Sequence, residues 1–173
     1  MNVAFIISLA GVDRPNLIQE LAKYTDEKQG KWINSRVNYL DSHIAANIKV
    51  EAPEENKAAI INYFTTQEKI TCYIEDINLA EQTPSKTVCL SIKSTDRSGL
   101  VADITHIVNQ QKTQLVKIDN HRFSVQPLGH NVFTAELSVK IDEDSAVEDL
   151  IAKLKTISDD IIVNIEECDS NNS

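Results

Sequence analysis

The sequence is poor in aromatic residues, which make up 5% of its 173 positions. So few rings favour a core built mainly of aliphatic side chains. The longest apolar stretch spans residues 3–10, with Ser8 inside it, and is far shorter than the ~20 residues that a membrane-spanning helix needs. No basic segment followed by an apolar one precedes this stretch, as a secretory leader would require. We therefore expect a folded cytoplasmic protein that makes no membrane contact.

Positive charge is scarce and scattered along the chain. The sequence has 17 lysines and arginines against 26 aspartates and glutamates, which gives a formal net charge of -9. No cluster of basic residues reverses this balance locally, so the field of the protein repels phosphate backbones. We expect no direct binding to nucleic acid.

Cysteine is also rare. Cys72, Cys89 and Cys168 are an odd number of widely spaced residues, and they fit neither a CxxC metal pattern nor a disulfide framework. Cys72 and Cys89 lie in apolar runs, where cysteine packs as a small hydrophobic residue. The sequence therefore predicts reduced thiols, as is usual in a cytosolic protein.

The common catalytic and metal-binding motifs are absent from the sequence. It contains no GxSxG turn, no phosphate loop ending in GK[ST], no GxGxxG after a strand and no HExxH. No two of the histidines stand four residues apart on a predicted helix, and none adjoins a cysteine ligand pattern. These histidines are His43, His106, His121 and His130. We expect surface or turn histidines, no cofactor, no metal site and no enzymatic activity.

An internal repeat organises the chain. Residues 9–18, LAGVDRPNLI, recur 83 positions later as residues 92–101, IKSTDRSGLV. Before each copy, apolar residues alternate with a period of two, which predicts a strand with one buried face. After each copy, apolar residues follow the spacing of an amphipathic helix. Each half is thus predicted to begin with a strand, a turn and a helix, with Asp13 and Asp96 as the helix N-caps.

The later elements also correspond between the two halves. The predicted segments are hairpins at 32–50 and 115–141, second helices at 54–64 and 145–157, and closing strands at 70–79 and 161–165. The order βαββαβ, present twice, predicts an α+β fold of two ferredoxin-like units, each a four-stranded antiparallel sheet with both helices on one face. The expected division is a first domain at 1–79, a linker at 80–86, a second domain at 87–167 and a disordered tail at 168–173.

The repeated turn also carries a recognisable motif. Asp13-Arg14-Pro15-Asn16-Leu17 and Asp96-Arg97-Ser98-Gly99-Leu100 both follow an aliphatic strand and open a helix. They resemble the D-R-x-G-L signature of the ACT domain family, although Asn16 stands where that signature has glycine. The resemblance covers nearly the whole chain. Two such units without an attached catalytic or DNA-binding domain resemble the family of glycine cleavage system transcriptional repressors.

This resemblance implies a function and a site. It implies a regulator that represses glycine cleavage genes by contacting a LysR-type transcriptional activator, with glycine as the free amino acid that it senses. Helix N-terminal amides attract a carboxylate, an aspartate receives an ammonium group, and glycine lets a ligand approach the backbone. The ligand-binding residues implied are Asp13, Arg14 and Asn16 in the first loop and Asp96, Arg97 and Gly99 in the second.

Other interpretations stay open from the sequence. An aspartate cap and a glycine in the first turn also suit a helix that binds nothing. The chain is alternatively a ligand-free interaction or dimerisation module, or an acyl-phosphate hydrolase on the same scaffold with Arg14 or Arg97 in its anion loop. The low glycine content of both loops argues against the hydrolase. A homo-oligomer formed through sheet edges is also compatible with the sequence.

Overall fold

The computed structural model describes residues 1–77, 86–111, 113–125, 129–141 and 145–168. The chain divides into two compact units, Met1–Glu81 and Gln82–Ser173. Most of the expected linker, 80–86, and most of the expected tail, 168–173, lie outside the described residues. Two residues of these segments are described and belong to the second unit, because Lys86 begins a strand and Cys168 is bonded to Cys89.

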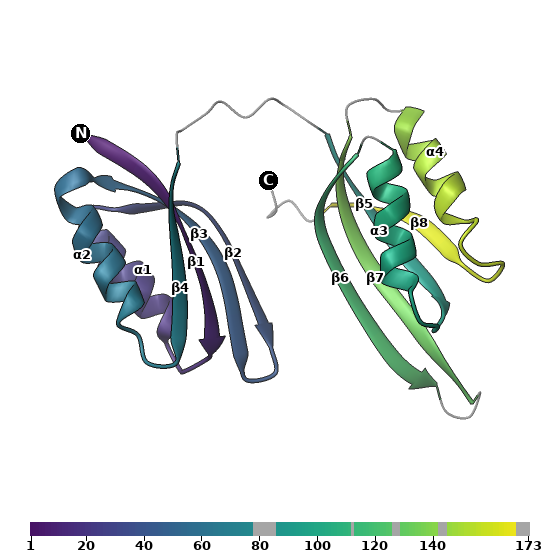
Figure 1. Cartoon of the computed structure of the whole chain (residues 1–173), viewed down its shortest axis with the longest axis horizontal. Helices are drawn as coiled ribbons and strands as arrows, with labels where there is room; N and C mark the ends of the chain where they lie inside the picture. Colours follow the sequence, from purple (N-terminus) through teal and green to yellow (C-terminus); the bar gives the residue numbers. More distant parts are fainter. Residues whose placement is uncertain (78–85, 112, 126–128, 142–144, 169–173) are drawn as a thin grey trace. The chain divides into compact units, whose positions relative to one another are not determined.

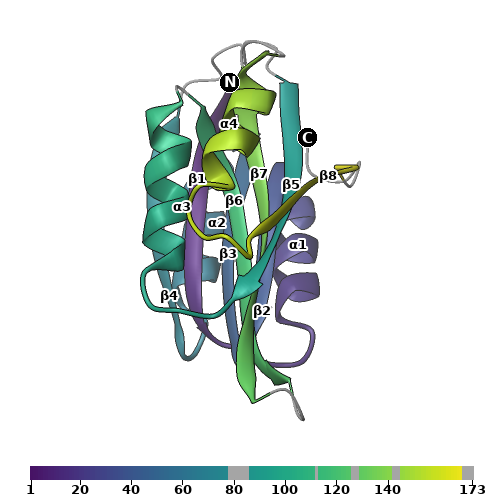
Figure 2. The same ribbon diagram turned by 90° about the vertical axis from the view of Figure 1, so that its right-hand side faces the viewer.

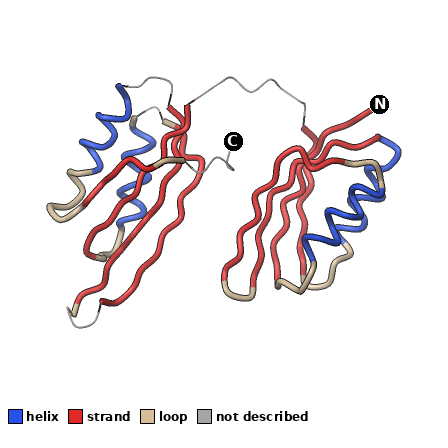
Figure 3. The backbone as a smooth tube through the Cα atoms, turned by 180° about the vertical axis from the view of Figure 1, so that it is seen from behind, coloured by secondary structure: helices blue, strands red, loops and turns tan. Residues whose placement is uncertain are grey.

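The first unit has the predicted order βαββαβ (Figure 1). Its elements are β1 (Asn2–Val12), α1 (Leu17–Glu27), β2 (Lys31–Leu40), β3 (His43–Pro53), α2 (Glu54–Thr65) and β4 (Ile70–Ile77). The strands form one antiparallel sheet in the order β2-β3-β1-β4. Figure 3 shows both helices on the same face of this sheet.

The second unit repeats this arrangement. Its elements are β5 (Lys86–Thr95), α3 (Leu100–Gln110), β6 (Gln114–Val125), β7 (His130–Ile141), α4 (Ser145–Leu154) and β8 (Ile162–Glu166). The sheet order is β6-β7-β5-β8, and α3 and α4 lie side by side over one face (Figure 2). The structure confirms the α+β class and the two units with two helices each.

Each core follows from the alternation of side chains along a central strand. Phe5, Ile7 and Leu9 of β1 point to the helices and are at most 3% exposed. They belong to a cluster that also contains Leu21 of α1 and Phe64 of α2. Burial of one such side chain stabilises the unit by roughly 1.5–3 kcal/mol, so the alternation alone fixes which face of the sheet is covered.

The same rule gives the second core. Leu90 and Ile92 of β5 are buried against Leu100 and Ile104 of α3 and Leu150 of α4. Side chains at the alternate positions of this unit's strands lie on the opposite, open face of the sheet. We call this the open face of the second unit, and its residues include Ser91, Lys93, Lys117, Asp119, Glu136 and Asn164. Their polarity suits a sheet face that no helix covers.

The cysteines differ from the expectation of reduced thiols. A disulfide joins Cys89 on β5 to Cys168, two residues beyond the end of β8, with 5.3 Å between the Cα atoms. Cys72 on β4 is a free, half-buried thiol, as predicted. The prediction failed for the pair because 79 residues separate its members in sequence, and only the pairing of β5 with β8 brings them together.

One carboxylate fastens the end of β5 to the loop before β8. Asp160 accepts hydrogen bonds from the amide of Thr95 at 2.6 Å, from the Ser94 hydroxyl at 3.1 Å and from the Ser158 hydroxyl. The Ser158 hydrogen bond, followed by those of Thr95, holds the pKa of the Asp160 carboxyl well below its ordinary value. In the first unit the equivalent amide, that of Val12, donates to the backbone carbonyl of Lys69 at 3.1 Å.

Because the Asp160 carboxylate can be protonated and the Lys69 carbonyl oxygen cannot, we expect the two units to respond differently to acid. Because the folded pKa of Asp160 is lowered, its stabilising effect is present above its unfolded value of about 3.9 and is lost as the pH falls through the folded pKa. We expect Asp160→Asn to lower the Tm of the second unit at pH 6, and the difference from wild type to shrink below about pH 3. Calorimetry from pH 7 to pH 2 measures this difference.

The first unit supplies the internal control for this experiment. Trp32 is the single tryptophan of the chain and lies on β2, so its fluorescence follows the first unit alone. Its transition should be the same in both proteins at every pH, because a carbonyl oxygen does not titrate there. A difference between wild type and Asp160→Asn that is constant over the whole pH range would contradict the assigned role of the carboxylate.

Candidate functional site

The repeated turn between the first strand and the first helix has the same backbone in both units. The helices begin at Leu17 and Leu100, and the N-cap positions are Asn16 and Gly99. Both N-cap residues are left-handed, with φ of 65° and 85°. The prediction that Asp13 and Asp96 cap these helices was wrong, because the chain makes a further turn before helical geometry starts, and the aspartates lie three residues upstream of the N-caps.

This geometry gives the fourth position of the motif a conformational role. Left-handed backbone is disfavoured for most residues with a Cβ atom, but glycine adopts it freely and asparagine is the next most tolerant type. Asn16 therefore departs from the family signature in chemistry and keeps its backbone conformation. Among the described residues no side chain forms a cap hydrogen bond at the start of either helix, so the amides of both first turns have no side-chain acceptor there.

Arg14 fastens the first loop to two neighbouring elements. Its guanidinium donates to the Glu20 carboxylate on α1 at 2.6 Å and to the Gln67 amide oxygen, between α2 and β4, at 2.8 Å. The hydrogen bond from Arg14 lowers the pKa of Glu20, and the same contact raises the pKa of Arg14. Arg14 thus holds the loop in place through a charge-assisted pair.

Arg97 does the same in the second unit. It donates to the Asp103 carboxylate on α3 at 2.7 Å and to the carbonyl of Ile157, beyond α4, at 3.3 Å. These contacts commit both motif arginines to the protein itself.

The two motif aspartates have different surroundings. Asp96 accepts from Nε of Arg122 on β6 at 2.8 Å, and its side chain is only 17% exposed. The equivalent of Arg122 in the first unit is Tyr39, since each pairs with the corresponding residue of the next strand. Within the part of the chain that the structure describes, no side chain forms an ion pair or a hydrogen bond with the Asp13 carboxylate. The described charge that acts on the Asp13 carboxylate is that of Arg14, which forms its own hydrogen bonds to Glu20 and Gln67.

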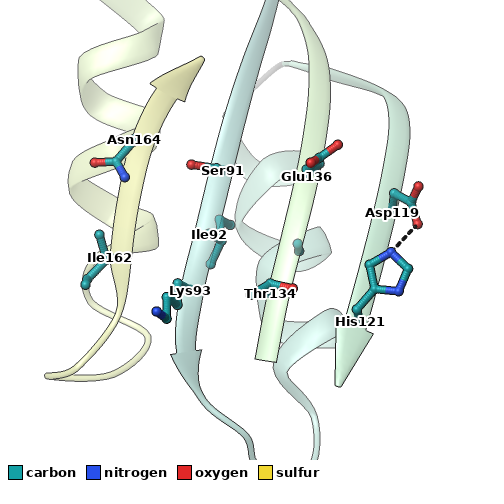
Figure 4. Close-up of a pocket in the computed structure, with 10 residues that line it drawn as sticks. Ser91, Ile92, Lys93, Asp119, His121, Thr134, Glu136, Ile162 and Asn164 are labelled. Atoms are coloured by element: carbon teal, nitrogen blue, oxygen red, sulfur yellow. Dashed lines mark ion pairs between the residues drawn. The ribbon is translucent and has the colours of Figure 1, made fainter. Parts of the chain in front are cut away.

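The open face of the second unit carries a separate hollow of about 510 Å³ (Figure 4). All four strands line it: Ser91 and Lys93 on β5, Thr134 and Glu136 on β7, Asp119 and His121 on β6, and Ile162 and Asn164 on β8. His121 is exposed and lies 3.6 Å from Asp119. Lys93 and the carboxylates of Asp119 and Glu136 lie among other polar side chains here, which suits a sheet face in contact with water.

Neither a metal centre nor a membrane span is found in the described ranges. No three His, Cys, Asp or Glu side chains there gather into a set that would hold a metal ion. His43, His106 and His121 are exposed, as predicted, and the side chain of His130 lies outside what the structure describes. No helix among the same residues has the length and apolar character needed to cross a membrane.

The repeat also indicates functional residues outside the D-R-x-G-L motif. Glu20 and Asp103, the partners of the two arginines, are themselves 83 positions apart, so the repeat places an acid at the same point of each helix. Arg122 gave no such signal, because Tyr39 replaces it in the first unit. Gln67 and Asp160 lie in loops whose sequences do not correspond between the halves.

Models of known protein families match each of the two units. Two profiles, both described as ACT domain, match residues 4–66 and 85–163, one in each unit. The chain therefore belongs to the ACT-domain proteins, in a tandem arrangement. ACT domains are regulatory modules, so the class defined by the fold and the two loops is that of a regulatory protein.

Two solved structures align with nearly the whole chain. A protein of unknown function from Galdieria sulphuraria aligns with a TM-score of 0.84 at 14% identity, covering 97% of this chain and 99% of that chain. A protein proposed to be a glycine cleavage system transcriptional repressor aligns with a TM-score of 0.72 at 16% identity, with the same coverage of 97% and 99%. At these identities the likeness concerns the fold. No curated protein matches the chain by sequence at a significant level.

The left-handed turn makes a prediction about stability. We expect Gly99→Ala to lower the free energy of unfolding of the second unit by roughly 1–2 kcal/mol, because alanine is strained at φ 85°. A Cβ atom there would lie 3.9 Å from Arg97 Nη1, so the loss reports backbone strain and not a clash. Gly99→Asn should cost about half as much, since Asn16 adopts the same conformation. Urea unfolding followed by circular dichroism measures both. Equal losses for the two variants would refute the explanation.

Proposed function

We propose that this chain is an amino-acid-responsive transcriptional regulator without a DNA-binding domain of its own. It represses glycine cleavage genes by contacting a transcriptional activator of the LysR type, and glycine is the ligand that changes this contact. Three facts support the proposal: the tandem ACT units, the likeness in fold to a protein proposed to be a glycine cleavage system transcriptional repressor, and a net charge of -9 that disfavours direct contact with DNA.

The main support for the proposal is the pair of polar groups in the first loop. This loop combines a helix N-terminus at which no described side chain forms a cap hydrogen bond with the Asp13 carboxylate, which forms no hydrogen bond or ion pair with a described side chain. A free amino acid is a zwitterion, and these two features suit its two charges. The amides and the positive end of the helix dipole receive the carboxylate, and Asp13 receives the ammonium group. Arg14, through Glu20 and Gln67, keeps the loop in the shape that places both features together.

The second loop is the matched comparison within the same chain. Its helix is also uncapped and Gly99 leaves the backbone accessible, but Asp96 is already paired with Arg122. An ammonium group would have to displace a guanidinium that holds a nearly buried carboxylate, which is unfavourable. We therefore assign the ligand site to the first loop, in which Asp13 receives the ammonium group and Arg14 and Asn16 set the conformation of the loop. In this proposal Asp96, Arg97 and Gly99 keep the same architecture without taking the ligand.

Calorimetric titration tests this assignment, with glycine first and a panel of other amino acids after it. Asp13→Asn should weaken glycine binding at least about tenfold, because a hydrogen bond to a charged group contributes about 1.5–3 kcal/mol. Asp96→Asn, the matched control, should change the affinity by less than about twofold. Equal losses in both variants, or a loss only in Asp96→Asn, would contradict the assignment to the first loop. Circular dichroism verifies that each variant is folded.

The contact with an activator is tested by the coupling between the two ligands. We expect saturating glycine to change the affinity of this chain for a purified LysR-type activator by roughly 5- to 150-fold, and the activator to change the affinity for glycine by the same factor. Biolayer interferometry with and without glycine measures the first change. An activator affinity that glycine does not alter would favour the ligand-free interaction module instead.

A further inference from the structure

The disulfide of the second unit lies just beyond the end of β8, the shortest strand of its sheet. β8 pairs with β5 over five positions, from Ile162 opposite Lys93 to Glu166 opposite Cys89. The equivalent strand of the first unit, β4, pairs with β1 over eight positions. Beyond Glu166 the chain continues along β5, and the sulfur of Cys168 lies 3.6 Å from the Thr87 carbonyl oxygen. The disulfide therefore fastens a segment that the β-ladder no longer holds.

Few other described contacts hold this end of β8. The Ser91 hydroxyl donates to the Glu166 carboxylate at 2.7 Å on the open face. On the other face Ile165 is 59% exposed, so it contributes little burial. An edge strand of five residues with one exposed hydrogen bond at its end is expected to fray. The covalent bond is thus the main constraint on the position of the chain after Glu166.

The two sulfurs are also placed where they can react. Cys89 points to the open face beside Ser138, and Cys168 follows an exposed segment; both are only half-buried. They lie next to a second hollow of the open face, lined by Lys117, Glu136, Ser138, Glu166 and Glu167 among others. Cys72 provides a contrast. Its thiol donates to the Phe64 carbonyl at 3.4 Å, and burial raises its pKa, so it is a poorer nucleophile.

We propose that Cys89 and Cys168 form a reversible thiol–disulfide pair, which makes the attachment of β8 to β5 sensitive to redox conditions. A small dithiol reduces the pair by supplying two electrons and two protons. The S–S bond breaks, two cysteine thiols form, and the dithiol becomes a disulfide. A small-molecule disulfide drives the reverse reaction and is itself converted to thiols. This proposal does not depend on glycine binding, so an experiment that refutes one of the two proposals leaves the other unaffected.

Reduction changes which surface the second unit presents. Without the covalent bond, the segment after Glu166 is free to leave Thr87, and the short ladder of β8 opens more readily. The outer edge of β5 then offers backbone groups to which another strand can add. Oxidation closes that edge and also closes a long loop of the chain, which stabilises the second unit relative to its unfolded state.

The experiment uses the full chain carrying Cys72→Ala, so that only the proposed pair can react. The protein is equilibrated with oxidised or reduced dithiothreitol, and maleimide labelling with intact mass counts the free thiols. We expect none after oxidation and two after reduction, with the oxidised protein remaining a single chain on a non-reducing gel. Two labelled thiols under both conditions, or a disulfide between chains, would overturn the proposal.

The structural consequence is measured on the same samples. Reduction should lower the Tm of the second unit by roughly 10 °C or more, while the transition followed by Trp32 fluorescence stays unchanged. Hydrogen exchange of Ile162–Glu166 should accelerate at least about tenfold. The Cys168→Ser variant cannot form the disulfide, so its Tm and its exchange rates should equal those of the reduced protein. Dithiothreitol should change neither quantity in this variant. Equal Tm and equal exchange in the two redox states would show that the bond does not control β8.

Discussion

Each unit depends on a central strand that is paired along both of its edges. β1 lies between β3 and β4, and β5 lies between β7 and β8, so the register of each strand is fixed from two sides. A slip of one residue would turn Phe5, Ile7 and Leu9 to the face of the sheet opposite the helices and remove the core. Because the central strand cannot shift, the position of the turn between this strand and the first helix is fixed as well. The candidate ligand loop is a consequence of this constraint.

The fold could be predicted because its signals are local. Alternation along strands, helical spacing and an 83-residue repeat together indicated two βαββαβ units, and the structure confirms the elements to within a few residues. The helix starts were wrong by three residues. Aspartate suits an N-cap by its chemistry, but the backbone reaches helical geometry only after the left-handed Asn16 and Gly99. Residue type alone does not reveal φ.

The site was predictable only in part, for a related reason. The repeat identified the loops and their arginines, and it placed Glu20 and Asp103 where those arginines need an acid. Contacts that depend on elements outside the repeat gave no signal. The pairing of Asp96 with Arg122 requires the register of a neighbouring hairpin, and the disulfide requires two segments 79 residues apart. The ligand-binding residues and the domain boundaries stay predictions.

The difference between Tyr39 in the first unit and Arg122 at the equivalent position of the second has a consequence for the proposed response to a ligand. If only the first loop takes a ligand, one chain has one site, and its occupancy rises hyperbolically with concentration. Moving from one tenth to nine tenths occupied then needs a concentration change of roughly two orders of magnitude. Under the proposed function, a chain with this asymmetry responds to the ligand concentration in a graded manner. A sharper response would then require cooperative assembly, either of several chains with one another or of the chain with the proposed activator.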